Sequence, residues 1–359
     1  MKKWIVIGLM LPMSLSAQVD SLDIKIGQMI ILGLDDFTKL DKREPFFDYI
    51  KQGYLGNVIL YGKHINTKNP EKSLKEITSY IQEVAPIPVF ISIDEEGGKV
   101  NRLKPAYGFP KTVSAQYLGS IDIDDSTRFY ARATAKTLRN LGINMNFAPD
   151  VDLMVNPTNP VIVKAERSYS ADMKIVAKHS ALVIDEQKKE GVVNVIKHFP
   201  GHGSSTSDTH LGIADVSKLW KIEELYPYKV LIEQDKVQAI MTAHIVNERL
   251  DPDRLPATLS KPIVTGILRN FFNYDGVIIS DDMQMKAISE HFGFEEAITL
   301  SINAGVDMIM FANNTKAALQ VTLPEIHGYI RKQVLGGQIP MNRINESYNR
   351  ILKLKQELK

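Results

Sequence analysis

Eight short apolar runs alternate along the chain with longer amphipathic stretches, and this alternation constrains the fold more than any other feature of the sequence. Runs that are apolar throughout predict strands buried on both faces, as in a parallel sheet covered by helices. Eight such repeats in about 320 residues predict an α/β fold, a (β/α)8 TIM-type barrel in a single domain; a doubly wound open sheet is the second choice. The predicted strands are residues 28–34, 57–61, 89–93, 144–147, 192–196, 239–242, 277–279 and 307–311.

The stretches between these runs have the apolar spacing of helices. The clearest are residues 73–84, 126–141, 173–189, 262–272 and 295–304, and a basic helix over 341–358 closes the chain. The 43 basic and 42 acidic residues nearly cancel, and the basic residues form no stripe. This balance argues against a nucleic-acid partner and favours a small, neutral or mildly charged ligand.

Residues 1–17 have the pattern of a signal peptide. Lys2 and Lys3 precede an apolar stretch over residues 4–15, and small residues precede a predicted cleavage after Ala17. An uncleaved anchor is the alternative, but the stretch is short for a membrane span. We expect residues 18–359 to form the functional domain, periplasmic or secreted, with no stable membrane insertion once the signal is removed. The sequence has no cysteine, which excludes disulfides, thiol catalysis and thiolate zinc sites.

Polar side chains follow the carboxyl ends of most predicted strands. Because these ends face one mouth of a barrel, we expect the side chains to converge there. Scatter over the surface is the alternative. The groups are Asp94–Glu96, Asp150 with Asp152, Lys197 with His198, His244, Asp281 with Asp282, and Asn313 with Asn314.

The segment 197–210, Lys-His-Phe-Pro-Gly-His-Gly-Ser-Ser-Thr-Ser-Asp-Thr-His, is the most informative of these. Gly201 and Gly203 favour a loop over a helix. Asp208 and His210 lie two residues apart, so the carboxylate can orient the imidazole and leave its other nitrogen to exchange a proton. Lys197 adds a cation that suits a bound polar ligand.

Two further clusters carry candidate ligand-binding groups. Adjacent strand residues point to opposite faces, so only one of Asp281 and Asp282 is expected in the mouth; the other is expected to pair with backbone or a cation. Asp94 and Arg102 flank a Gly-Gly turn and suit a polyhydroxylated ligand. Arg167 is a further donor, or else forms a surface ion pair with a neighbour such as Glu166.

A metal site assembled from histidines and Asp208 is an alternative. His198 and His202 are four residues apart, but Pro200 and Gly201 between them exclude a shared helical face. For His202 a structural role is favoured. A metal-dependent barrel amidohydrolase stays open as a rival interpretation; its ligand set would be His198, His202, Asp208, His210 and His244.

In this order, the motifs resemble glycoside hydrolase family 3, specifically its short single-domain β-N-acetylhexosaminidase branch. Members typically carry Asp-x-Glu-Gly-Gly-x-Val-x-Arg, then Arg-Ser-Phe, then Lys-His-Phe-Pro-Gly-His-Gly-Asp-Thr-x-x-Asp-Ser-His, then Ser/Thr-Asp. The likeness covers nearly the whole chain after the signal. The departures are Ser204 and Ser205 for Asp-Thr, Thr209 for Ser, Tyr169 for Phe, and Glu95 and Lys99 where Gln and Arg are frequent.

The resemblance implies a retaining glycosidase that needs no metal and no organic cofactor. Asp281 would be the nucleophile, and His210 with its partner Asp208 the general acid/base. The substrate would be a small N-acetylglucosamine-containing carbohydrate, from peptidoglycan fragments or chitin-type oligosaccharides. A phosphorylase of the same fold and a non-catalytic sugar-binding protein also stay open as rival interpretations. The implied sugar-binding residues are Asp94, Arg102, Arg167, Lys197 and His198.

Overall fold

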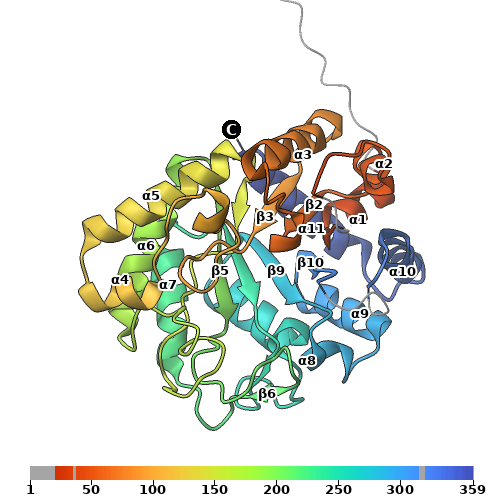
Figure 1. The fold of residues 1–359 in the computed structure, drawn as a ribbon. Coiled ribbons are helices and arrows are strands. Elements are labelled where there is room, and N and C mark those ends of the chain that lie inside the picture. Colours follow the sequence, from red (N-terminus) through yellow and green to blue (C-terminus); the bar gives the residue numbers. More distant parts are fainter. Residues whose placement is uncertain (1–20, 35–37, 315–319, 359) are drawn as a thin grey trace, which may run out of the picture.

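Eight parallel strands close into a barrel at the centre of the molecule, and helices surround it (Figure 1). The computed structural model describes residues 21–34, 38–314 and 320–358, so the predicted signal peptide lies outside the described residues. Around the barrel the strands run in the order β1, β10, β9, β7, β5, β4, β3, β2. They are β1 (Ile30–Gly33), β2 (Asn57–Leu60), β3 (Phe90–Ile93), β4 (Met145–Asn146), β5 (Val193–Phe199), β7 (Ala239–Thr242), β9 (Val277–Asp282) and β10 (Met308–Phe311).

The barrel and all eight predicted strands are confirmed, which excludes the doubly wound open sheet. Most strands are buried along their whole length, as the continuous apolar runs require. One boundary is wrong: Gln28 ends helix α1 (Leu22–Gln28), and the strand begins only at Ile30. The apolar run 28–34 therefore spans the end of a helix as well as a strand.

The second correction concerns β5 and β9, which run further than their apolar patterns. Lys197 and His198 belong to β5 itself, because the ladder continues to Phe199, paired with Thr242 of β7. Asp281 and Asp282 likewise close β9. The hydrophobic pattern stops early at these strands because their last residues face a polar mouth instead of the core.

The described helices pack around the barrel with buried apolar faces. Residues 262–271, predicted as part of an α-helix, form a π-helix, η5 (Pro262–Phe271). A small parallel sheet of β6 (Ala214–Asp215) and β8 (Ile245–Val246) lies beyond the barrel. No helix in the described part of the chain is both long and apolar enough to cross a bilayer. The α-helices are α1, α2 (Pro45–Lys51), α3 (Pro70–Val84), α4 (Ala115–Ile121), α5 (Asp124–Asn140), α6 (Met173–Lys189), α7 (Tyr226–Glu233), α8 (Lys286–Ser289), α9 (Phe294–Ala304), α10 (Leu323–Leu335) and α11 (Met341–Lys355).

Candidate active site

The carboxyl ends of β3 and β5 bring a buried lysine between two carboxylates. Lys197 Nζ lies 2.8 Å from Asp94 Oδ1 and 2.6 Å from Glu96 Oε1, and its side chain is 2% exposed. Burial acts to lower the pKa of Lys197, but the two carboxylates outweigh it and the pKa is raised. The ammonium therefore stays charged at the barrel mouth.

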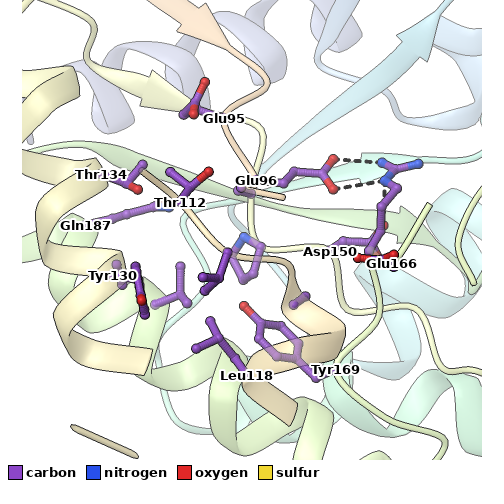
Figure 2. A pocket seen from close by; sticks show the side chains of 18 residues that line it. Glu95, Glu96, Thr112, Leu118, Tyr130, Thr134, Asp150, Glu166, Tyr169 and Gln187 are labelled. Atoms are coloured by element: carbon purple, nitrogen blue, oxygen red, sulfur yellow. Dashed lines mark hydrogen bonds and ion pairs between the residues drawn. The ribbon is translucent and has the colours of Figure 1, made fainter. Parts of the chain in front are cut away.

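Arg167 joins the same cluster from the loop after β4. Its guanidinium donates to both oxygens of Glu96 at 2.9 and 2.8 Å, the contacts dashed in Figure 2. It also donates to His198 Nε2 at 3.0 Å. A guanidinium has no acceptor, so His198 Nδ1 carries the hydrogen and donates to Asp152 Oδ2 at 2.7 Å. The alternative of a surface pair with Glu166 is wrong.

Arg102 lies on the other side of Asp94. Its guanidinium is 3.4 Å from Asp94 Oδ2 and 5.7 Å from the Tyr61 ring centroid, while its buried Nε has no hydrogen-bond partner in the described structure. Burial acts to raise the pKa of Asp94, but Lys197 and Arg102 outweigh it and lower the pKa. Asp94 is thus a carboxylate held between two cations, with oxygens that can accept sugar hydroxyl protons.

The loop after β5, residues 200–210, is called the motif loop below. At two of its glycines the neighbouring atoms leave no room for a side chain. Gly201 has φ +116°, and a Cβ there would lie 2.6 Å from Glu224 Cβ. A Cβ on Gly203 would lie 1.8 Å from Leu153 O. These glycines let the chain turn and approach its neighbours, as the sequence predicted.

This loop ends in the predicted acid/base pair. Asp208 Oδ1 accepts from both the backbone N–H and Nδ1 of His210, each at 2.8 Å. The His210 side chain is 63% exposed, which leaves Nε2 able to reach a ligand. Ala287 N donates to Thr209 O at 3.2 Å, so the loop lies against the segment that follows β9. His210 therefore lies on a loop that borders the segment after β9.

Asp281 and Asp282 have different environments. Asp282 Oδ1 accepts from the backbone N–H groups of Gln284 and Ala312, each at 3.1 Å, and burial raises its pKa to about 6. Burial also acts to raise the pKa of Asp281, but the imidazoles of His244, His198 and His210 lower it overall. Asp281 Oδ1 also accepts from a backbone N–H, that of Asp282 at 2.8 Å, so the two carboxyls differ in the imidazole charges that lower the pKa of Asp281.

The predicted histidine set does not assemble as a metal site. Burial lowers the pKa of His202 to about 4, and His202 contacts Thr209 Oγ1 at 3.4 Å. His244 is buried between Thr258 Oγ1 and Asp282 O, each 2.9 Å away. Both ring nitrogens of His244 thus have partners within the protein, whereas the buried Nδ1 of His202 has none among the described residues.

Among the residues that the structure describes, the donor atoms of Asp150, Asp152 and His198 lie within 4.8 Å of one another. They could in principle hold a cation. However, Arg167 Nε already lies 3.3 Å from Asp150 Oδ2, and Asp152 is hydrogen-bonded to His198. A guanidinium thus already supplies the positive charge beside this group.

Sequence reasoning missed the partners that hold the sugar-binding candidates in place. Glu96 binds both Lys197 and Arg167, and Asp152 binds His198. Both acids had a usable signal, since each follows a predicted strand. The sequence could not predict which basic residue each acid binds, because the partners lie 46 to 101 positions away in sequence.

Comparisons with known proteins assign the chain to a family. A model of the "Glycosyl hydrolase family 3 N terminal domain" matches residues 21–354. Beta-hexosaminidase A of Pseudoalteromonas piscicida is 32% identical over 329 residues, which cover 85% of this chain and 54% of that protein. Beta-hexosaminidase LpqI of Mycobacterium tuberculosis is 30% identical over 339 residues, covering 92% and 82%. The chain thus spans about half of the first relative and most of the second.

Solved structures show the same architecture. A glycoside hydrolase family 3 β-N-acetylglucosaminidase from Paenibacillus sp. str. FPU-7 matches with a TM-score of 0.83 and 30% identity, covering 94% of this chain and 62% of that one. M. tuberculosis LpqI matches with a TM-score of 0.79 and 27% identity, covering 93% and 94%. The closed parallel barrel surrounded by helices defines the class of TIM-type barrels. Within that class, the chain belongs to glycosyl hydrolase family 3.

Proposed function

We propose that this protein is a retaining β-N-acetylhexosaminidase that removes terminal N-acetylglucosamine from peptidoglycan fragments or chitin-type oligosaccharides. The relatives named above as β-hexosaminidases and β-N-acetylglucosaminidase support the reaction type. The single observation that carries the proposal is that the loop with the Asp208–His210 pair lies against the segment that follows β9, the strand that ends in Asp281 and Asp282. No metal or organic cofactor takes part in the proposed reaction.

In the first step Asp281 attacks the anomeric carbon and forms a glycosyl ester. The imidazolium of His210 gives its Nε2 proton to the leaving oxygen, while Asp208 holds Nδ1–H and stabilises the charged ring. In the second step neutral Nε2 takes a proton from water, which attacks the same carbon and releases the sugar with retained configuration. Each proton transfer contributes about 10²–10⁴-fold.

The remaining residues bind the terminal sugar. Asp94 accepts hydroxyl protons between Lys197 and Arg102, and Arg167 and His198 line the same mouth. Ion pairs fix these side chains before substrate arrives, so that little side-chain freedom is lost on binding.

Hydrolysis of p-nitrophenyl N-acetyl-β-glucosaminide tests the proposal. We expect turnover by the wild type and its near-complete loss in Asp281→Ala; equal rates would refute the assignment. A 2-deoxy-2-fluoro or 5-fluoro glycosyl donor should label Asp281, read by mass spectrometry of the trapped protein. Release of a sugar 1-phosphate in phosphate buffer would instead identify a phosphorylase.

We also propose export to the periplasm or the medium. The basis is the sequence of residues 1–17, with Lys2 and Lys3 ahead of the apolar stretch and small residues up to Ala17. Expressed with its native N-terminus, the protein should be recovered outside the cytoplasm with Gln18 as first residue. Intact-mass measurement of the fractionated protein checks this, and a full-length cytoplasmic chain would contradict it.

A further inference from the structure

Glu95 lies at the end of β3 between Asp94 and Glu96, yet its side chain turns away from the barrel mouth. It is 3% exposed and lines a cavity of mixed polar and apolar character, together with Thr112, Thr134 and Gln187. Figure 2 shows Glu95 apart from Glu96 and Asp150, on another side of this cavity. In the described structure its carboxylate accepts hydrogen bonds from backbone N–H groups and from no sugar-binding side chain.

Its carboxylate instead binds the main chain of a neighbouring loop. Glu95 Oε2 accepts from the backbone N–H of Arg102 at 2.8 Å and from that of Leu103 at 3.0 Å. The main chain of Glu95 is anchored on β4, where Asn146 donates to its carbonyl and accepts from its N–H, both at 3.0 Å. One side chain thus ties the Arg102 segment to two adjacent barrel strands.

The loop between Glu95 and Arg102 forms a turn in which the backbone N–H groups of Glu96 and Gly97 both donate to Val100 O at 3.1 Å. Gly97 and Gly98 have φ angles of +96° and +58°. Glycine adopts positive φ angles readily, whereas other residues rarely do. Lys99 within it is half exposed and reaches Glu166 across the surface. The two hydrogen bonds to Glu95 hold the main chain at Arg102 and Leu103, just after this turn.

The position of Arg102 decides what its side chain can bind. Its guanidinium reaches back to Asp94 and lies over Tyr61, and its buried Nε has no hydrogen-bond partner in the described chain. The N–H groups of Arg102 can donate to a sugar hydroxyl only if the guanidinium lies beside Asp94, which binds the same sugar. A shift of about 1 Å is enough to weaken such a contact.

We propose that Glu95 is a positioning residue for the terminal sugar, acting through the main chain of Arg102; this inference rests on the proposed function. The acceptor oxygen does the positioning, and the charge is dispensable. Burial raises the pKa of Glu95 to about 7, against the opposing backbone N–H groups of Leu103 and Arg102, so the neutral form is close at hand. Gln, frequent at this place in the family pattern, keeps a carbonyl oxygen for both N–H groups.

Steady-state kinetics with p-nitrophenyl N-acetyl-β-glucosaminide tests this. Glu95→Ala should raise KM about tenfold, with kcat within threefold of wild type, since the reacting groups Asp281 and His210 are untouched. Glu95→Gln should keep both constants within threefold. Lys99→Ala, on the same loop but outside the contact, is the matched control and should behave as wild type.

A double-mutant cycle establishes that Glu95 acts through Arg102. Glu95→Ala should add nothing to the effect of Arg102→Ala on KM, because the positioned group is already gone. Additive effects, or a wild-type KM in Glu95→Ala, overturn the inference. Should Glu95→Ala melt below the assay temperature, Glu95→Met, which is of similar length but has no acceptor oxygen, takes its place with the same expectations.

The two proposals fail in different ways. An active wild type with an unaffected Glu95→Ala overturns only the role of Glu95. An inactive wild type overturns the proposed hydrolysis. The role of Glu95 is then tested by measuring N-acetylglucosamine binding by calorimetry. In that assay Glu95→Ala should weaken binding about tenfold and Glu95→Gln should not; equal binding by all three overturns the inference.

Discussion

The two adjacent aspartates at the end of β9, Asp281 and Asp282, lie in different environments and are expected to have different roles. Because successive strand residues point to opposite faces, the two carboxyls have different surroundings: imidazole charges act on Asp281, and Asp282 accepts from the backbone N–H groups of two other segments. Asp281 has the lowered pKa expected of a carboxylate ready to attack, whereas burial raises the pKa of Asp282 to about 6. Sequence alone predicted this division, and the resemblance named the first acid as the nucleophile.

Alanine at each position should therefore give opposite results. Asp282→Ala leaves two backbone N–H groups without their acceptor and should cost about 2–4 kcal/mol of unfolding free energy. Asp281→Ala should abolish turnover and cost less stability, about 1–2 kcal/mol, because it leaves only one backbone N–H, that of Asp282, without its acceptor. Urea denaturation followed by circular dichroism, beside the rate assay, separates them. Equal loss of stability in both variants would contradict the division.

At the scale of elements, the motif loop rests on the short helix η3 (Ile222–Leu225). Glu224, fully buried there, accepts from the backbone N–H of Ser204 at 3.3 Å, and burial raises its pKa to about 8. The family pattern has an aspartate where this chain has Ser204. A second carboxyl at that place would lie against Glu224 in a buried site, which gives the departure a physical reason.

Ser204→Asp should accordingly cost about 3 kcal/mol or more of unfolding free energy, since it adds a buried, unpaired acid. Adding Glu224→Gln should recover a large part of the loss, because one of the two acids is then gone. Ser204→Ala, which brings no charge, is the control and should stay within about 1 kcal/mol of wild type. A harmless Ser204→Asp, measured by urea unfolding at pH 7, would refute the explanation.

The strands show which elements the hydrophobic pattern of the sequence predicts and which it misses. The apolar runs located all eight strands, because burial on both faces leaves a continuous signature. They ended β5 and β9 too early, since the last residues of these strands face the polar mouth. The sheet of β6 and β8 has only two residues in each strand, too few for a period-2 pattern to appear.

For the whole molecule, the notable feature is how the C-terminal helix packs against the amino-terminal ends of the strands. The sequence predicts a basic helix over 341–358, yet Lys355 of α11 is buried. Its Nζ donates to Gln28 Oε1 at 2.6 Å and to Gly56 O at 2.9 Å, and lies 5.1 Å from the Phe90 ring centroid. These contacts are neutral, and burial lowers the pKa of Lys355 well below its usual value.

This depressed pKa makes global stability depend on pH. Between the lowered folded-state pKa and the unfolded-state pKa of about 10.4, unfolding takes up a proton, so stability rises with pH at up to about 1.4 kcal/mol per unit. The unfolding free energy of wild type relative to Lys355→Met should therefore increase between pH 7 and 9. Lys353→Met, at an exposed position of the same helix, should show no such trend. A flat difference for Lys355→Met would contradict the prediction.

The sequence by itself determined the barrel, its eight repeats, the glycine-bearing motif loop and the candidate carboxylates and imidazoles. Each of these features is predicted by the spacing of residue types within a short segment of the sequence. Only the tertiary structure decided that Arg167 binds Glu96, 71 positions away, that Lys197 binds Asp94, 103 positions away, and that Lys355 is buried. Such pairings arise when barrel closure brings distant strand ends together, and no local pattern records which charges then meet.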